Sequence, residues 1–143
     1  MARDEGIQGA IDAFEATLET FVAGDAGPTT AQWSRRDDIT IFGGWGAYER
    51  GWAAVSSRLA WAASRFSGGR VTYEPLAAGS SGDLGYAIGL ERGEAHVAGQ
   101  GQPSPLVLRV THLFRREEGE WRMIHRHADP ITVKTAPMEI LQR

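Results

Sequence analysis

The chain of 143 residues contains no cysteine, which excludes disulfide bonds, thiolate metal sites and a cysteine nucleophile. It also lacks an excess of positive charge. Its formal net charge is -3, and its basic residues are scattered along the sequence rather than clustered. Because proteins bind nucleic acid largely by neutralising phosphates, we expect no nucleic-acid partner.

Long apolar runs are also missing. No stretch of the sequence approaches the roughly 20 apolar residues that a membrane-spanning helix needs. The first segment, MARDEGIQGAIDAFEATLETF, is acidic and periodic, and it lacks the basic and apolar blocks of a signal peptide. We therefore expect no membrane partner and a cytoplasmic location.

What the chain does have is an ordinary globular composition, with 42% hydrophobic and 23% charged residues. Its length suits one domain with one core. The sequence shows no repeat, no low-complexity tract and no internal boundary. We therefore expect a single domain over residues 1–143.

Helical spacing is confined to the first half of the chain. Residues 7–21 place apolar side chains at intervals of three and four, which predicts an amphipathic helix. A short helix carrying Trp33 is expected next, and residues 52–66 return to helical spacing. Between them, residues 39–42 are typical of a short strand.

The second half has the alternation of β-strands. Strands are predicted over residues 70–76, 84–97, 106–116 and 120–129, with the segment AAGSSGD as a turn. Helices followed by a run of strands predict an α+β fold with the helices on one face of an antiparallel sheet. Both sheet faces carry apolar residues, so we expect helices and a pocket on one face and a homodimer contact through the other.

The turn between the last two strands decides which side chains share a face. A two-residue turn, Glu118-Gly119, would pair His112 with His125 and place His127 on the same face, as in a metal site. That turn needs a positive φ at Glu118, which glutamate disfavours. A three-residue turn over residues 117–119 places the glycine in the left-handed position of a type I turn with a bulge, and we prefer it.

In the preferred register His112 lies opposite Ile124. One face then carries Val110, His112, Ile124, Arg126 and Ala128, and the other carries Arg109, Thr111, Trp121, Met123, His125 and His127. A zinc site at the two paired histidines would need a further ligand such as Asp129. Without a thiolate or a second histidine pair we predict no metal and no cofactor, and we expect interface or hydrogen-bonding roles for these histidines.

His112 is the candidate general base or anion contact, since imidazole titrates near neutral pH. The expected ligand contacts come from three parts of the chain: Trp45 and Tyr48 in a glycine-rich loop, Tyr86 and Ile88 on a strand, and Val110 and Ile124 beside His112. Glu91 alternates with small residues, and it is expected to face away from Ile88 and the pocket.

Four segments together support a family resemblance: the N-terminal helix, ITIFGGWGAYERGWAAV, SGDLGYAIG and RVTHLFRREEGEWRMIHRHAD. They resemble the SnoaL-like, ketosteroid-isomerase-like branch of the nuclear transport factor 2-like superfamily, over nearly the whole chain. The most specific part is the pattern G-x-W-x-hydrophobic-hydrophobic-H-x-H on the last strand. This pattern is also similar to the association domain of calcium/calmodulin-dependent protein kinase.

The resemblance implies a cone-shaped fold in which a curved antiparallel sheet is wrapped by N-terminal helices around a cavity, usually as a dimer. Enzymes of the family use a cavity carboxylate as proton acceptor, and in the SnoaL-like cyclases it falls near Arg126 of this chain. Here a cation stands in that place. A cavity holding His112 and Arg126 favours an anionic or carbonyl-bearing ligand.

The leading expectation is therefore a cavity protein of SnoaL-like type that binds a small organic molecule. We further expect acid–base chemistry through His112 and Arg126, as in an isomerase, cyclase, dehydratase or hydrolase. The alternative is a noncatalytic ligand-binding or assembly module. The residues do not decide between an enzyme and a binding protein.

Overall fold

The structure is a computed structural model that describes residues 5–141. Its helices are α1 (Glu5–Glu15), α2 (Leu18–Val22), α3 (Gly27–Thr30), α4 (Trp52–Ser64) and the short 3-10 helix η1 (Pro137–Ile140). Its strands are β1 (Thr40–Phe42), β2 (Glu49–Arg50), β3 (Phe66–Ser81), β4 (Leu84–Val97), β5 (Ser104–Glu117) and β6 (Glu120–Asp129).

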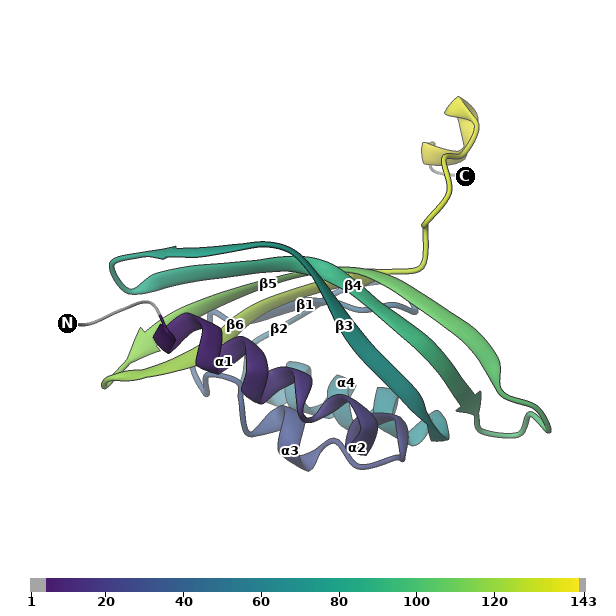
Figure 1. Ribbon diagram of the computed structural model, residues 1–143, viewed down its shortest axis with the longest axis horizontal. Helices are drawn as coiled ribbons and strands as arrows, with labels where there is room; N and C mark the ends of the chain where they lie inside the picture. Colours follow the sequence, from purple (N-terminus) through teal and green to yellow (C-terminus); the bar gives the residue numbers. More distant parts are fainter. Residues whose placement is uncertain (1–4, 142–143) are drawn as a thin grey trace.

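The strands form one curved sheet in the order β2-β1-β6-β5-β4-β3. All neighbours are antiparallel except β1 and β6, which run parallel. Helices α1 to α4 lie against one face of the sheet, and the C-terminal segment leaves toward the opposite side (Figure 1). We call the helix-covered side the inner face and the opposite side the outer face. The predicted α+β architecture is confirmed.

The apolar spacing of the N-terminal segment explains how the helices cover the sheet. Ile7, Ile11 and Phe14 of α1 are buried in the core. The predicted continuous helix is interrupted after Glu15, where the buried Thr17 hydroxyl donates to the Phe14 carbonyl at 2.7 Å. Trp33 is fully buried as well, but it forms a bridge with Met123 beside the sheet and lies outside α3, so the prediction of a short helix carrying Trp33 is wrong.

The hairpin of β3 and β4 is longer than predicted. The segment expected to be a turn continues as strand up to Ser81, and the reversal is made by Gly82 and Asp83. Small residues of this segment still pair regularly with β4, for example Gly79 with Tyr86. The Gly and Ser residues indicated a turn, but the ladder with β4 decided the structure.

The register of the β5–β6 hairpin also differs from the prediction. Glu117 pairs with Glu120, so the turn contains only Glu118 and Gly119, with φ of 52° and 84°. Leu113 then pairs with His125 and Phe114 with Met123, which leaves an extra residue in β6 at Ile124. The predicted three-residue turn is therefore wrong, because glutamate does adopt the left-handed conformation here. The bulge shifts the register by one residue.

As a result of this bulge, His112 pairs with Arg126 and not with Ile124. The two residues nevertheless share the inner face, as predicted. Met123 was expected on the opposite face and instead lies in the core with Trp33 and Phe114. Within residues 5–141 no helix is long and apolar enough to cross a membrane.

Candidate functional site

Three polar side chains from three strands meet on the inner face. Arg126 donates to Glu91 through two nitrogens, with Nη1–Oε2 at 2.7 Å and Nη2–Oε1 at 2.9 Å. Its Nη1 also lies 2.8 Å from Nε2 of His112. The side chains of Arg126 and Glu91 are 14% and 3% exposed, and His112 is buried. We call this group the inner cluster.

Helix α1 covers the inner cluster with an aromatic ring. The Phe14 ring lies 4.6 Å from the His112 ring, and the Arg126 guanidinium carbon is 5.7 Å from the Phe14 ring. Burial, together with the adjacent Arg126 guanidinium, lowers the pKa of His112 well below its ordinary value. The imidazole is therefore neutral at neutral pH, and its Nε2 accepts the hydrogen bond from Arg126.

Tyr73 of β3 stands next to the inner cluster, directly across the ladder from Glu91. Its buried hydroxyl has no hydrogen-bond partner among residues 5–141. Burial raises the pKa of Tyr73, and the carboxylates of Glu91 and Glu15 add to this. The ring packs over Gly89, where a Cβ atom would lie 2.6 Å from it. Glycine at this position therefore lets the aromatic ring approach the sheet.

A small hollow of about 90 Å³ opens between α1 and β3 at Tyr73. Its lining residues are Gln8, Ile11, Glu15, Tyr73, Pro75 and Ala78. An unpaired buried hydroxyl is unfavourable unless water or a ligand satisfies it. Tyr73 therefore forms part of the wall of this hollow.

Glu91 is the residue of the inner cluster that the sequence analysis missed. It does point away from Ile88, as the alternation along β4 predicted. However, β4 pairs with β5 so that Ala87 faces His112, and this places Glu91 on the same face as His112 and Arg126. The expectation that Glu91 lies apart from these two residues is therefore wrong. The inner face does contain a buried carboxylate.

The other residues expected at the pocket are divided between regions. Val110 is buried on the inner face, and Ile124 packs against the same core. Tyr86 and Ile88 lie on the outer face, 41% and 38% exposed, and do not meet the inner cluster. Trp45 packs against Trp61 and Phe66, whereas Tyr48 is 74% exposed beside Phe42.

The outer face has a hollow of its own, with a volume of about 290 Å³. It is lined by Leu76, Ile88, Gly89, Leu90, Arg109, Val110, Thr111, His127 and Asp129. We call it the outer hollow. Arg109 donates to both carboxylate oxygens of Asp129, from Nε at 2.7 Å and from Nη2 at 2.8 Å. The Asp129 carboxylate also lies 3.3 Å from Nε2 of His127.

His125 and His127, the two histidines of the last strand, both lie on this outer side. His125 Nδ1 lies 2.7 Å from the Thr40 hydroxyl, and both histidine rings contact the edge or face of Phe42. Within residues 5–141, no three histidine or carboxylate side chains gather in a way that could hold a metal ion.

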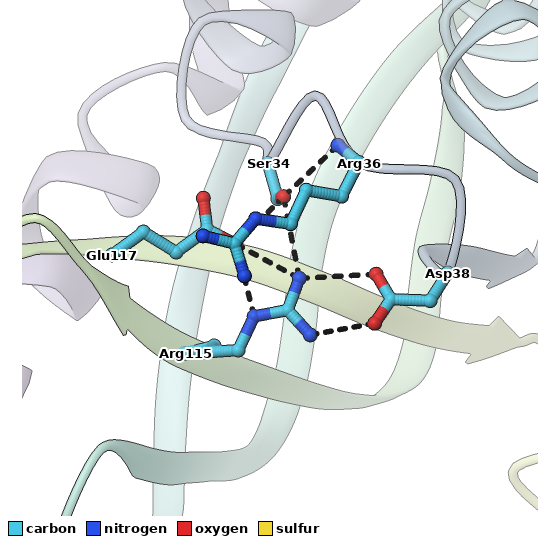
Figure 2. Close-up of polar contacts among 5 residues, drawn as sticks. All are labelled: Ser34, Arg36, Asp38, Arg115 and Glu117. Carbon is cyan, nitrogen blue, oxygen red and sulfur yellow. Dashed lines mark hydrogen bonds and ion pairs between the residues drawn. The ribbon is translucent and has the colours of Figure 1, made fainter.

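A second polar cluster ties the tip of the β5–β6 hairpin to the loop before β1 (Figure 2). Arg115 donates to both oxygens of Asp38, at 2.7 and 3.0 Å, and to Glu117 at 2.9 Å. Glu117 also accepts from the Ser34 hydroxyl at 2.8 Å and pairs with Arg36 at 3.6 Å. Arg115 and Glu117 are part-buried, and their contacts fix the position of the loop.

Comparison with known proteins gives one family and many structures. The SnoaL-like domain family matches residues 11–132. A nuclear transport factor 2-like superfamily protein from Salmonella enterica is 18% identical, with a TM-score of 0.78 and 94% of each chain covered. A ketosteroid isomerase-like protein from Erwinia carotovora atroseptica is 18% identical, with a TM-score of 0.75, covering 90% of this chain and 96% of its own.

A Thiobacillus denitrificans protein provisionally named as a calcium/calmodulin-dependent protein kinase type II association domain is also similar. It is 24% identical, with a TM-score of 0.67, over 86% of this chain and 93% of its own. No curated protein sequence matches the chain. At these identities the structural similarities establish the fold and not an activity.

Proposed function

The chain belongs to the SnoaL-like domain family, and from this premise we propose that it binds a small, partly apolar organic molecule against the inner face of its sheet. The binding site comprises the inner cluster and Tyr73, with Val110 and Ile124 as apolar neighbours. The single observation that carries the proposal is the buried Tyr73 hydroxyl, which has no partner within residues 5–141, on a residue that pairs across the ladder with Glu91 of the inner cluster. A ligand oxygen would satisfy it.

Arg126 supplies further donors to the same region. Its guanidinium has five N–H groups, and the contacts with Glu91 and His112 use three of them. Two N–H groups remain for an oxygen of the ligand. A carbonyl oxygen would thus receive hydrogen bonds from Tyr73 and Arg126, which polarises the carbonyl group.

Acid–base chemistry is the second part of the proposal. Glu91 is the proton acceptor, because its carboxylate keeps free lone pairs beside the two hydrogen bonds from Arg126, whereas the single Nε2 lone pair of His112 is already occupied by Arg126. His112 is therefore a positioning residue that holds Arg126, and Arg126 in turn orients the carboxylate. This assignment differs from the sequence-based expectation that His112 is itself the base.

The binding site can be tested by protein NMR with a set of small aromatic ketones and carboxylates. Molecules that bind are expected to shift the signals of Ala87 and Ala128 on the inner face. Tyr73→Phe should weaken their binding about threefold to tenfold, the worth of one hydrogen bond. Tyr86→Phe removes the same hydroxyl from the outer face and should leave binding unchanged. Shifts confined to the outer face would contradict the proposal.

The chemistry needs its own experiment. A ketone that binds should exchange its α-protons for deuterium faster in the presence of the protein, and Glu91→Gln should abolish this acceleration. Circular dichroism would check that the variant is folded.

The noncatalytic alternative is supported by a different observation. Glu91 and His112 already accept hydrogen bonds from Arg126, and the Phe14 ring covers His112 and Arg126. Such a group can serve binding without turnover. Binding at the inner face with no protein-dependent deuterium exchange would establish this alternative.

We also propose that two copies pair through their outer faces, as the apolar residues on both faces of the sheet suggested. The outer face exposes several large apolar side chains, namely Phe42, Leu76, Leu84, Tyr86, Ile88 and Leu113. A patch of this kind on a folded domain is typical of an interface. Sedimentation at about 10 µM should show a dimer, and a monomer would contradict the proposal. The cytoplasmic location stays a prediction.

A further inference from the structure

The segment after β6 is unusual because it leaves the body of the protein and exposes its apolar side chains. Every residue from 130 to 141 is exposed. Five of them are large and apolar, and their exposed fractions range from 52% at Ile131 to 80% at Ile140. Figure 1 shows this segment standing off the sheet on the side opposite the helices. We call residues 131–141 the C-terminal arm.

The arm begins at the rim of the outer hollow. Asp129, the last residue of β6, lines that hollow, and the apolar side chains of its lining include Leu76, Ile88 and Leu90. The Ile131 amide donates to the Asp129 carboxylate at 3.0 Å, and the Thr132 amide donates to the Pro130 carbonyl at 2.9 Å. These bonds direct the chain away from its own sheet, so the arm does not cover the hollow from which it starts.

We propose that in the dimer the C-terminal arm of each copy packs into the outer hollow of the other copy. The inference rests on the proposed pairing of outer faces, and it adds a specific occupant for the hollow. A two-fold dimer has two arms and two outer hollows, so a reciprocal exchange of arms fills both hollows. Facing sheets pack about 10 Å apart. An extended chain covers about 3.3 Å per residue, so the arm is long enough to reach across.

The absence of native cysteine makes the exchange directly measurable by disulfide cross-linking. Ile140→Cys places a thiol on the arm, and Ile88→Cys places one in the hollow. If one variant carries an affinity tag, a link between the two has an intermediate mass and is distinguished from links between identical chains. Mixing and mild oxidation should give this mixed product as the main species.

A matched control replaces Ile88→Cys with Ala13→Cys, which is an exposed position on α1 at the opposite side of the sheet. This mixture should give little mixed product. In the double variant Ile88→Cys/Ile140→Cys, a link within one chain that dominates over links between chains would show that the arm folds onto its own sheet. That result would overturn the inference, as would the absence of any link above the Ala13→Cys control.

Truncation distinguishes a failure of the arm from a failure of the dimer. A chain ending at Pro130 loses the apolar side chains of the arm and should dissociate more readily, with a dimer dissociation constant raised at least about tenfold. If the truncated chain dimerises as tightly as the full chain, the arm exchange is refuted while the outer-face dimer stands. If the full chain is monomeric at about 10 µM, both are refuted.

Discussion

Replacing Arg126 with methionine would remove the positive partner of a buried carboxylate and keep a side chain of similar length. Glu91 is only 3% exposed, and its carboxylate oxygens lie 2.7 and 2.9 Å from the Arg126 nitrogens. Breaking a buried ion pair by removing one partner costs about 3–5 kcal/mol, because the remaining charge is left uncompensated. That is a large part of the roughly 5–15 kcal/mol by which domains are stable.

The chain provides a matched control in Arg92→Met. Arg92 Nε lies 2.7 Å from an oxygen of Glu74, the same shortest separation, but the two side chains are 52% and 49% exposed. Water replaces the lost partner at such a site, so this substitution should cost less than about 1 kcal/mol. The contrast between the two variants isolates the effect of burial from the effect of distance.

The measurement is urea unfolding followed by tryptophan fluorescence, at one fixed protein concentration because dimerisation would shift the midpoint. The double variant Arg126→Met/Glu91→Leu removes both charges and should recover most of the loss. If Arg126→Met costs no more than Arg92→Met, the inner cluster is not a buried, coupled unit and the reasoning fails.

Three further predictions concern the hairpin, His112 and the polar cluster of Figure 2. Glu118→Asn should raise the free energy of unfolding by about 1 kcal/mol in urea melts, since asparagine tolerates the positive φ better than glutamate; a lower stability would contradict the turn geometry. His112 should stay neutral, with unchanged ring NMR signals, as the pH falls through the ordinary histidine value of 6.5, and an ordinary titration would show that it is not buried. The pKa of Asp38 is lowered by its hydrogen bond to Arg115, so its stabilisation is present above the ordinary carboxyl pKa and is lost as the pH falls through the lowered value. Asp38→Asn should therefore lose less stability on acidification than the original chain, and an equal loss would exclude this contribution.

Much of the fold could be predicted because its determinants are local. The spacing of Ile7, Ile11 and Phe14 predicted the buried side of α1, and strand alternation predicted that His112 and Arg126 share a face. The turn and the bulge were missed for a physical reason. The energetic cost of the left-handed conformation at Glu118 is small compared with the free energy gained when Met123 pairs with β5 and packs in the core. The sequence alone does not show how these two energies compare.

The place of Glu91 could not be decided from β4 by itself, because alternation shows which residues share a face but not which face meets the helices. Large apolar residues of β4 such as Ile88 were expected on the face that lines the pocket, but they lie on the outer face. The small residues were the usable signal. A Cβ atom at Gly85 would lie 2.7 Å from Ile7 of α1, and one at Gly89 would meet Tyr73. Glycines on the inner face therefore mark where the helix and an aromatic ring approach closely.

The most direct test of the central claim is a crystal structure of the protein with a ketone or carboxylate that the NMR screen shows to bind. Binding at the inner face predicts electron density for the molecule there, with one of its oxygen atoms within hydrogen-bonding distance of the Tyr73 hydroxyl and beside Arg126. Density found only in the outer hollow, with the Tyr73 hydroxyl still unpartnered, would contradict it.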